Sequence, residues 1–149
     1  VVSTSADLTS ALANTAVGHI LLAPGTYNLI FELNITRSII LEAALAGSAI
    51  LNAQASSLSQ RRVLNINPGP SGIVQLFGLG ITGGYTTSLF VLVFKVPIAL
   101  LEFSHVSRMC LQGSGVAVWG GTVAISSCTI SGNTATYVRA HVQRLPSPS

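Results

Sequence analysis

Residues 115–135 read GVAVWGGTVAISSCTISGNTA, and the spacing of their apolar side chains decides the fold. Apolar residues fall at offsets of 0, 2, 5 and 7 from Val123, and the same offsets recur forty-nine residues earlier, from Val74. The two sets are Val123, Ile125, Cys128 and Ile130, and Val74, Leu76, Leu79 and Ile81. Residues two apart lie on one face of a strand. The extra residue between the two pairs therefore predicts a bend that carries the apolar face around a corner.

Each copy of this pattern ends in a turn, at Gly83-Gly84 and at Gly132-Asn133. Short strands that turn corners and close with Gly or Asn are typical of a parallel β-solenoid, in which each circuit stacks on the one before. Earlier apolar pairs extend the repeat at spacings of 19 and then 25 residues: Ile20/Leu22, Ile39/Leu41 and Leu64/Ile66. The sequence thus predicts an all-β fold of about four circuits.

Between these pairs, the run from Tyr27 to Ile35 alternates, so that Tyr27, Leu29, Phe31, Leu33 and Ile35 share one face and Asn34 and Thr36 point the other way.

The stretch before the first strand has the period of a helix and not of a strand. Leu8, Ala11 and Leu12 form a helical apolar stripe, Ser5 is placed as the N-cap, and Asp7 lies in the first turn. We expect an amphipathic helix over residues 6–14 that covers the first circuit with Leu8 and Leu12 buried.

The segments HILLAPGTYNL, after an ADLTSAL helix, then ITGGY and GGTVAISSCTISGNTA, resemble the right-handed parallel β-helix repeat proteins of the pectin-lyase-like superfamily. The resemblance covers residues 1–84 and 115–135. It implies a right-handed parallel β-helix forming a single domain over residues 1–135. The family includes polysaccharide lyases and hydrolases, epimerases and adhesins, so the resemblance identifies a fold more than an activity.

Two segments depart from the repeat. Residues 85–114 are far longer than a corner, and we interpret them as an irregular circuit or an insertion. Residues 136–149 end in alternating Pro and Ser, and we expect a poorly ordered tail. No C-terminal cap is apparent in the sequence, which predicts edge-to-edge self-association at that end.

Composition narrows the class of partner. Charged residues make up 7% of the 149 residues, against about 25% in ordinary globular chains. The mean hydropathy is +0.64, yet the longest apolar run, residues 89–101, is interrupted by Lys95 and Pro97, which argues against a membrane span. The net charge of +3 reflects a shortage of acidic residues, four against seven basic ones, and the basic residues are mostly scattered, so a nucleic-acid surface is not indicated. Cys110 and Cys128 are compatible with a disulfide, although the core-facing position of Cys128 favours a buried free thiol.

The sequence offers few candidates for catalytic or ligand-binding side chains. Glu32 and Glu42 form the only pair of carboxylates that adjacent circuits could bring together, and both are expected on the outer surface. Paired carboxylates are what polysaccharide hydrolases use, but we assign no catalytic residue, metal ligand or cofactor. Arg37 is a candidate contact for an acidic sugar. Trp119, beside Gly120-Gly121, is the candidate for stacking on a sugar ring.

These observations favour a non-catalytic scaffold, extracellular or on the cell surface, that contacts polysaccharides or glycans. A surface rich in Ser, Thr, Asn and Gly and one glycosylation sequon, Asn34-Ile35-Thr36, suggest that location, although no signal peptide is visible in this chain. The alternative is a polysaccharide lyase or hydrolase, or a fragment of one.

Overall fold

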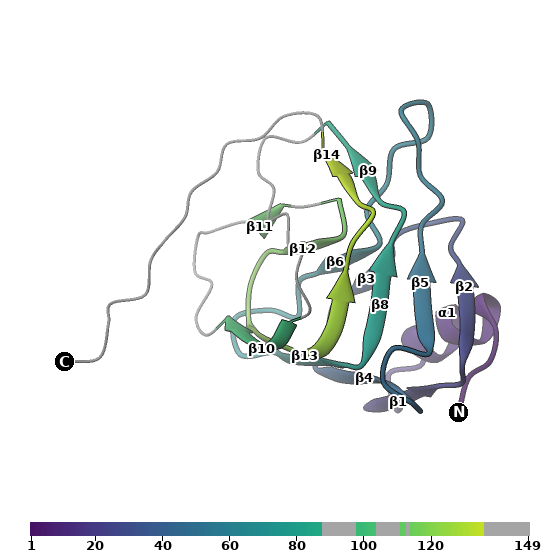
Figure 1. Ribbon diagram of the computed structural model, residues 1–149. Coiled ribbons are helices and arrows are strands. Elements are labelled where there is room, and N and C mark those ends of the chain that lie inside the picture. The colour runs from purple at the N-terminus through teal and green to yellow at the C-terminus, as the bar shows by residue number, and fades with distance from the viewer. Residues whose placement is uncertain (88–97, 104–110, 113, 136–149) are drawn as a thin grey trace.

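The computed structural model describes residues 1–87, 98–103, 111–112 and 114–135, and these are mostly β, with one short helix (Figure 1). The tail at 136–149 and Cys110 lie outside the described residues. The elements, in chain order, are α1 (Ser5–Ala13), β1 (His19–Leu22), β2 (Gly25–Asn28), β3 (Leu33–Ile35), β4 (Ile39–Ala43), β5 (Ala49–Asn52), β6 (Leu64–Ile66), β7 (Ile73–Phe77), β8 (Leu79–Thr82), β9 (Tyr85–Thr86), β10 (Ile98–Phe103), β11 (Leu111–Gln112), β12 (Val116–Val118), β13 (Thr122–Ile130) and β14 (Thr134–Ala135).

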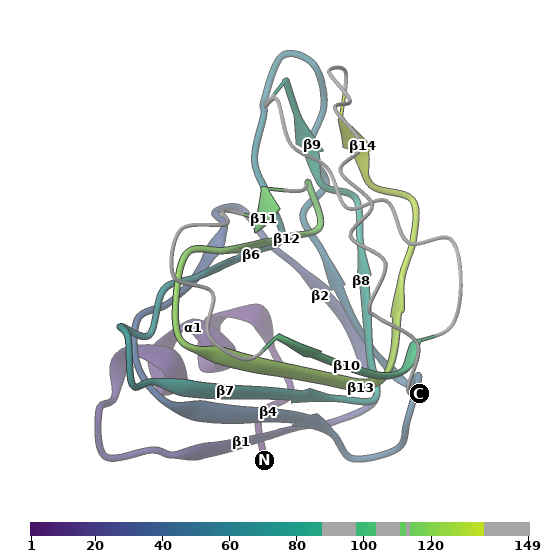
Figure 2. The same cartoon turned by 90° about the vertical axis from the view of Figure 1, so that its left-hand side faces the viewer.

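Strands that are neighbours in space come from distant parts of the chain and run parallel. One sheet has the order β1-β4-β7-β13-β8-β5-β2, with β13 long enough to pair with both β7 and β8. A second sheet contains β3, β6 and β12 side by side, and β14 pairs with β9. Figure 2 shows these rows of strands as the sides of a roughly triangular outline. The expectation of parallel strand stacks is therefore confirmed.

The forty-nine-residue repeat is confirmed in register. Val123 pairs with Val74, and Ile130 pairs with Ile81. The bend between the two halves is also present, because Gly78 and Ser127, the extra residues of the two copies, both have positive φ, 65° and 53°. Positive φ is a conformation that turns the chain sharply and that Gly adopts at no steric cost. The apolar face consequently continues from β7 into β8, and along β13, on the inside.

The core consists of mostly aliphatic side chains, with Tyr27 among them, stacked in columns across successive strands. One column joins β1, β4, β7 and β13 through Ile20, Leu41, Leu76 and Ile125, each at most 2% exposed. Other columns are Tyr27, Leu51, Ile81 and Ile130, and Leu33, Leu64 and Val116. Alternation within each strand explains this arrangement, since every second side chain points inward. Burying each such side chain contributes roughly 1.5–3 kcal/mol.

Helix α1 begins one residue earlier than predicted, and its cap is a different residue. Thr4 is the N-cap, with its hydroxyl accepting a 3.1 Å hydrogen bond from the backbone N–H of Asp7, while Ser5 is already helical. Leu8 is fully buried and Leu12 half-buried, as expected. The helix lies at the end of the stack formed by β1 and β2 (Figure 1). Within the described part of the chain, no helix is long and apolar enough to cross a membrane.

Residues 85–114 contain three described strands: β9, which pairs in parallel with β14, and β10 and β11. β10 runs antiparallel to β13, and β11 runs antiparallel to β12, whereas the repeat strands are parallel. Both strands lie along the last members of their stacks. β10 and β11 therefore pair with part of the C-terminal edge of the stacks, for which no cap is apparent in the sequence.

Candidate functional site

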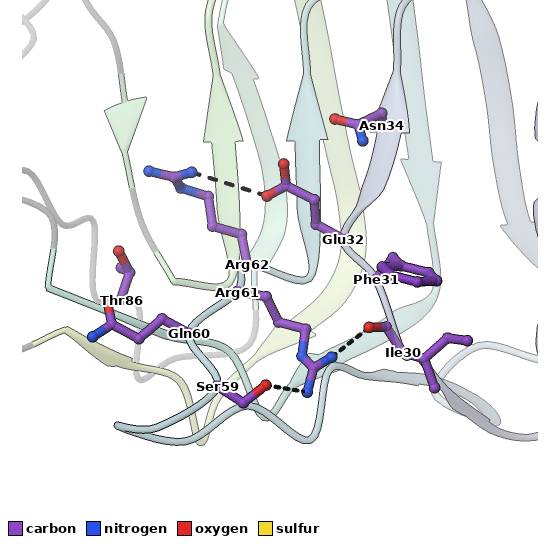
Figure 3. Close-up of a pocket in the computed structure, with 9 residues that line it drawn as sticks. All are labelled: Ile30, Phe31, Glu32, Asn34, Ser59, Gln60, Arg61, Arg62 and Thr86. Carbon is purple, nitrogen blue, oxygen red and sulfur yellow. Dashed lines mark hydrogen bonds and ion pairs between the residues drawn. The ribbon is translucent and has the colours of Figure 1, made fainter.

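A groove of about 580 Å³ lies where the chain passes from β2 to β3, beside the loop between β5 and β6 (Figure 3). It is lined by Ile30, Phe31, Glu32, Asn34, Ser59, Gln60, Arg61, Arg62 and Thr86. These residues come from three passes of the chain through the same corner of the molecule. The corner loops can vary in sequence because the core requires only that the flanking strands stay in register.

Apolar side chains are exposed at one end of the groove. Tyr27 and Leu29 are buried, but the alternation stops at the corner and Ile30 and Phe31 are 72% and 75% exposed. The prediction that Phe31 continues the inward face of Tyr27 and Leu29 is therefore wrong. The chain resumes its inward alternation only at Leu33, in β3. An exposed aromatic ring beside polar groups is a surface suited to binding rather than to packing.

The charged groups of the groove are one carboxylate and two guanidinium groups. Arg62 Nη1 lies 3.9 Å from Glu32 Oε2. Arg61 donates hydrogen bonds to the backbone carbonyl of Ile30 and, at 3.0 Å, to the hydroxyl of Ser59 (Figure 3). Arg61 thus holds the loop against the β2–β3 corner, while Arg62 faces Glu32 across the groove. The long separation of the Arg62–Glu32 pair makes it a weak ion pair that a ligand could replace.

Asn65, in β6, joins two of the predicted site residues. Its Nδ2 lies 2.8 Å from Asn34 Oδ1 and 3.3 Å from Glu32 Oε1, and its Oδ1 accepts a 2.7 Å hydrogen bond from the indole N–H of Trp119. Trp119 itself is 38% exposed. The result is a polar row, from Trp119 through Asn65 to Glu32, that leads from the end of β12 to the groove.

Sequence reasoning missed Asn65, although a signal for it was present. The tripeptide Leu-Asn-Ile occurs twice, at 33–35 and at 64–66, and these are β3 and β6. The two copies pair in parallel, with Asn34 beside Asn65. Identical tripeptides in neighbouring circuits place identical side chains in contact, because parallel stacking preserves register.

The other two predicted residues lie elsewhere and have different partners. Glu42 is on β4, and its Oε2 is 2.9 Å from His19 Nε2 on the neighbouring β1. Glu32, in the corner before β3, and Glu42, on β4, are thus engaged by separate groups and do not form a carboxylate pair.

The guanidinium group of Arg37 forms hydrogen bonds with backbone carbonyl groups. It donates to the carbonyls of Asn14 at 2.9 Å, Leu12 at 3.3 Å and Val17 at 2.5 Å. These carbonyls belong to the last turn of α1 and to the segment after it, where intrahelical partners are lacking. Arg37 therefore anchors the helix to the strands.

The groove combines an exposed aromatic ring with polar and charged side chains. It contains a single carboxylate, Glu32, and across the described residues no three His, Cys, Asp or Glu side chains gather in a way that could hold a metal ion. Its aromatic ring can stack on an apolar face, and its amide, carboxylate and guanidinium groups can exchange hydrogen bonds. Comparisons with family models, with curated proteins and with solved structures find no match to this chain.

Proposed function

We propose that the chain is a right-handed parallel β-helix of about four circuits. The support is the order of the strands: β1-β2-β3, β4-β5-β6 and β7-β8-β12 each send one strand to each successive stack. The long β13 then pairs with both β7 and β8, and β14 pairs with β9. The motifs that resemble the pectin-lyase-like superfamily support the same arrangement. In this arrangement α1 closes the first circuit and the β9–β12 connection is an insertion at one corner.

On this scaffold we place a non-catalytic, glycan-contacting surface centred on the groove, in a protein that works outside the cell or on its surface. The observation that carries the proposal is the row Trp119–Asn65–Glu32 leading to the exposed ring of Phe31. Sugars stack on aromatic rings and exchange hydrogen bonds with amides and carboxylates. A groove with one carboxylate lacks the second one that the common hydrolases use.

The test is binding of unmodified protein, produced in bacteria, to a panel of neutral and acidic polysaccharides by isothermal titration calorimetry. Phe31→Ala should weaken binding by about two- to twelve-fold, from the loss of a stacking contact of about 0.5–1.5 kcal/mol. The matched control is Ile73→Ala, which removes an apolar side chain that is 53% exposed but lies outside the groove. Equal losses in the two variants, or no binding by the parent protein, would overturn the glycan-contacting surface.

The same panel is assayed for turnover, because the alternative is a polysaccharide lyase or hydrolase. Glu32→Gln removes the charge of the groove carboxylate, and Glu42→Gln removes that of the carboxylate on β4. Turnover that Glu32→Gln abolishes and Glu42→Gln preserves would replace the scaffold by an enzyme with its active site in the groove. Binding without turnover supports the scaffold.

A further inference from the structure

The glycosylation sequon of the chain lies on the strand that borders the groove. Asn34, Ile35 and Thr36 follow one another through β3, where Leu33 and Ile35 are 5% and 1% exposed and point into the core. Asn34 and Thr36 are consequently exposed on the outer face. A sugar attached to Asn34 would leave the core columns untouched, so the folded chain can carry it.

The hydrogen bonds of Asn34 are compatible with a sugar on its amide nitrogen. Its Oδ1 accepts the 2.8 Å hydrogen bond from Asn65 Nδ2. N-glycosylation uses Nδ2 and leaves Oδ1 as an amide oxygen, so the bond to Asn65 persists in the modified protein. The chain contains seven Asn residues, and Asn34 alone has Ser or Thr two positions later. Asn65, its half-buried neighbour on β6, is followed by Ile66 and Asn67 and provides an internal comparison.

Asn34 lines the groove together with Glu32, Phe31 and Arg62 (Figure 3). Its side chain points to the same side of the chain as that of Glu32, and the exposed ring of Phe31 lies three residues earlier in the chain. An N-acetylhexosamine presents an apolar face and an acetyl methyl group that pack against such a ring. With such a sugar on Asn34, its hydroxyls would share the groove with the Glu32 carboxylate and the Arg62 guanidinium.

We propose that Asn34 is an N-glycosylation site, and that the first N-acetylglucosamine of its glycan lies in the groove against Phe31. The glycan contacted by the groove is then the protein's own. The inference rests on the proposed function in one respect, the passage of the chain through a secretory compartment.

The modification is a substitution at the anomeric carbon of a lipid-pyrophosphate-linked oligosaccharide, catalysed by the oligosaccharide-transferring enzyme of that compartment. Asn34 Nδ2 forms the new bond to the anomeric carbon and loses one proton. The bond from that carbon to the pyrophosphate oxygen breaks, and the lipid pyrophosphate leaves with the electron pair. No oxidation or reduction takes place.

The first experiment measures occupancy. The full chain is expressed in eukaryotic cells behind a secretory signal peptide, and both the secreted and the retained protein are treated with a glycoamidase that converts a glycosylated Asn to Asp. Peptide mass spectrometry should find that conversion at Asn34 and not at Asn65. Thr36→Ser should keep the modification, while Thr36→Ala and Asn34→Gln should abolish it. An unmodified Asn34 in protein that has entered the compartment would overturn the proposal.

The second experiment asks whether the sugar lies in the groove. Glycosylated protein is trimmed to a single N-acetylglucosamine, and its thermal midpoint is compared with that of unmodified protein from bacteria. The sugar should raise the midpoint by about 2–6 °C, and Phe31→Ala should remove that difference. A rise that Phe31→Ala leaves unchanged would overturn the placement against Phe31.

Different results would overturn the glycan-contacting surface and the glycosylation of Asn34. Occupancy of Asn34 with a Phe31-dependent rise in the midpoint sustains the inference even where unmodified protein binds no polysaccharide. Binding of free polysaccharide by the unmodified groove, together with an Asn34 that is never modified, overturns the inference and leaves the proposed function standing.

Discussion

The indole N–H of Trp119 donates a 2.7 Å hydrogen bond to the side-chain oxygen of Asn65, fifty-four residues earlier in the chain. The same amide donates through its nitrogen to Asn34 and Glu32. One side chain therefore joins three neighbouring strands of the outer surface. Since the amide has one acceptor and one donor group, the three partners fix which way it points.

Replacing Asn65 should disturb both Trp119 and the fold. Asn65→Ala removes the acceptor of the indole and the donor to Glu32, and we expect a loss of about 1 kcal/mol in the free energy of unfolding, measured in urea. Trp119 is the single Trp of the chain, so its fluorescence reports this site alone, and the emission should shift as the ring gains exposure to water. The control is Asn28→Ala, at an exposed position of β2. Identical urea midpoints and spectra for the two variants would contradict the network.

Arg37 should stabilise the chain through helix α1. Arg37→Met keeps the aliphatic stem and removes the donors to Asn14, Leu12 and Val17, and hydrogen bonds from a charged group contribute about 1.5–3 kcal/mol. We expect a loss near 2 kcal/mol, since part of the site is exposed, together with faster hydrogen exchange in α1.

Arg37→Lys provides the matched control for that measurement. It keeps the charge but cannot reach several carbonyls at once, because the ammonium group lacks the planar fork of the guanidinium. We expect only partial rescue. Hydrogen exchange in α1 that is the same in the Met variant and the parent protein would show that Arg37 does not anchor the helix.

Gly84 should tolerate no side chain. A Cβ atom at this position would lie 1.8 Å from the backbone carbonyl oxygen of Ser114, and backbone cannot move aside as a flexible side chain can. Gly84→Ala should therefore cost about 3 kcal/mol, the upper end of the range for overpacking. Gly18→Ala is the control, because nothing lies within 4 Å of its Cβ position. That variant should lose no stability and gain up to about 1 kcal/mol through the unfolded state. Equal midpoints in thermal unfolding would refute the close approach at Gly84.

The parts of the fold that could be predicted from sequence are those governed by periodicity. The offsets from Val74 and from Val123 gave the register and the corner, because side-chain direction in a strand depends only on position along it. The N-cap was placed one residue away, at Ser5 instead of Thr4. Both residues have hydroxyls that can cap a helix. Thr4 is the cap because its backbone is extended, with φ −129° and ψ 160°, and the spacing of apolar residues does not predict the backbone conformation of a single residue.

The groove could not be predicted in the same way. Phe31 points outward because the chain turns a corner whose length the sequence does not reveal. Arg37 and Arg62 look alike in sequence, yet one binds helix carbonyls and the other faces Glu32. The partners of such long side chains depend on which segments the tertiary structure brings near them, and the sequence pattern does not reveal this. The link through Asn65 was accessible only by noticing the repeated Leu-Asn-Ile.

Cys128 is free and buried, as its position in the repeat indicated. Its sulfur lies 3.3 Å from the backbone nitrogen of Leu79 and 3.2 Å from the carbonyl oxygen of Ser126. Burial raises the pKa of the Cys128 thiol, because the thiolate would lose its hydration. The folded protein thus holds this proton more tightly than the unfolded chain does.

The sign of the pH dependence follows from that difference. The contribution of Cys128 to stability is fully present below the pKa of the unfolded thiol, about 8.5, and is lost as the pH rises through the higher pKa of the folded state. Burial raises the pKa of Tyr27 as well, and its contribution declines only above about 10, the ordinary value for Tyr. Urea unfolding between pH 7 and 11, in a Cys110→Ser background that leaves one thiol, should therefore show stability falling in two stages. Cys128→Ala should flatten the first stage and Tyr27→Phe only the second. A first stage that survives in Cys128→Ala would assign the loss of stability to another group.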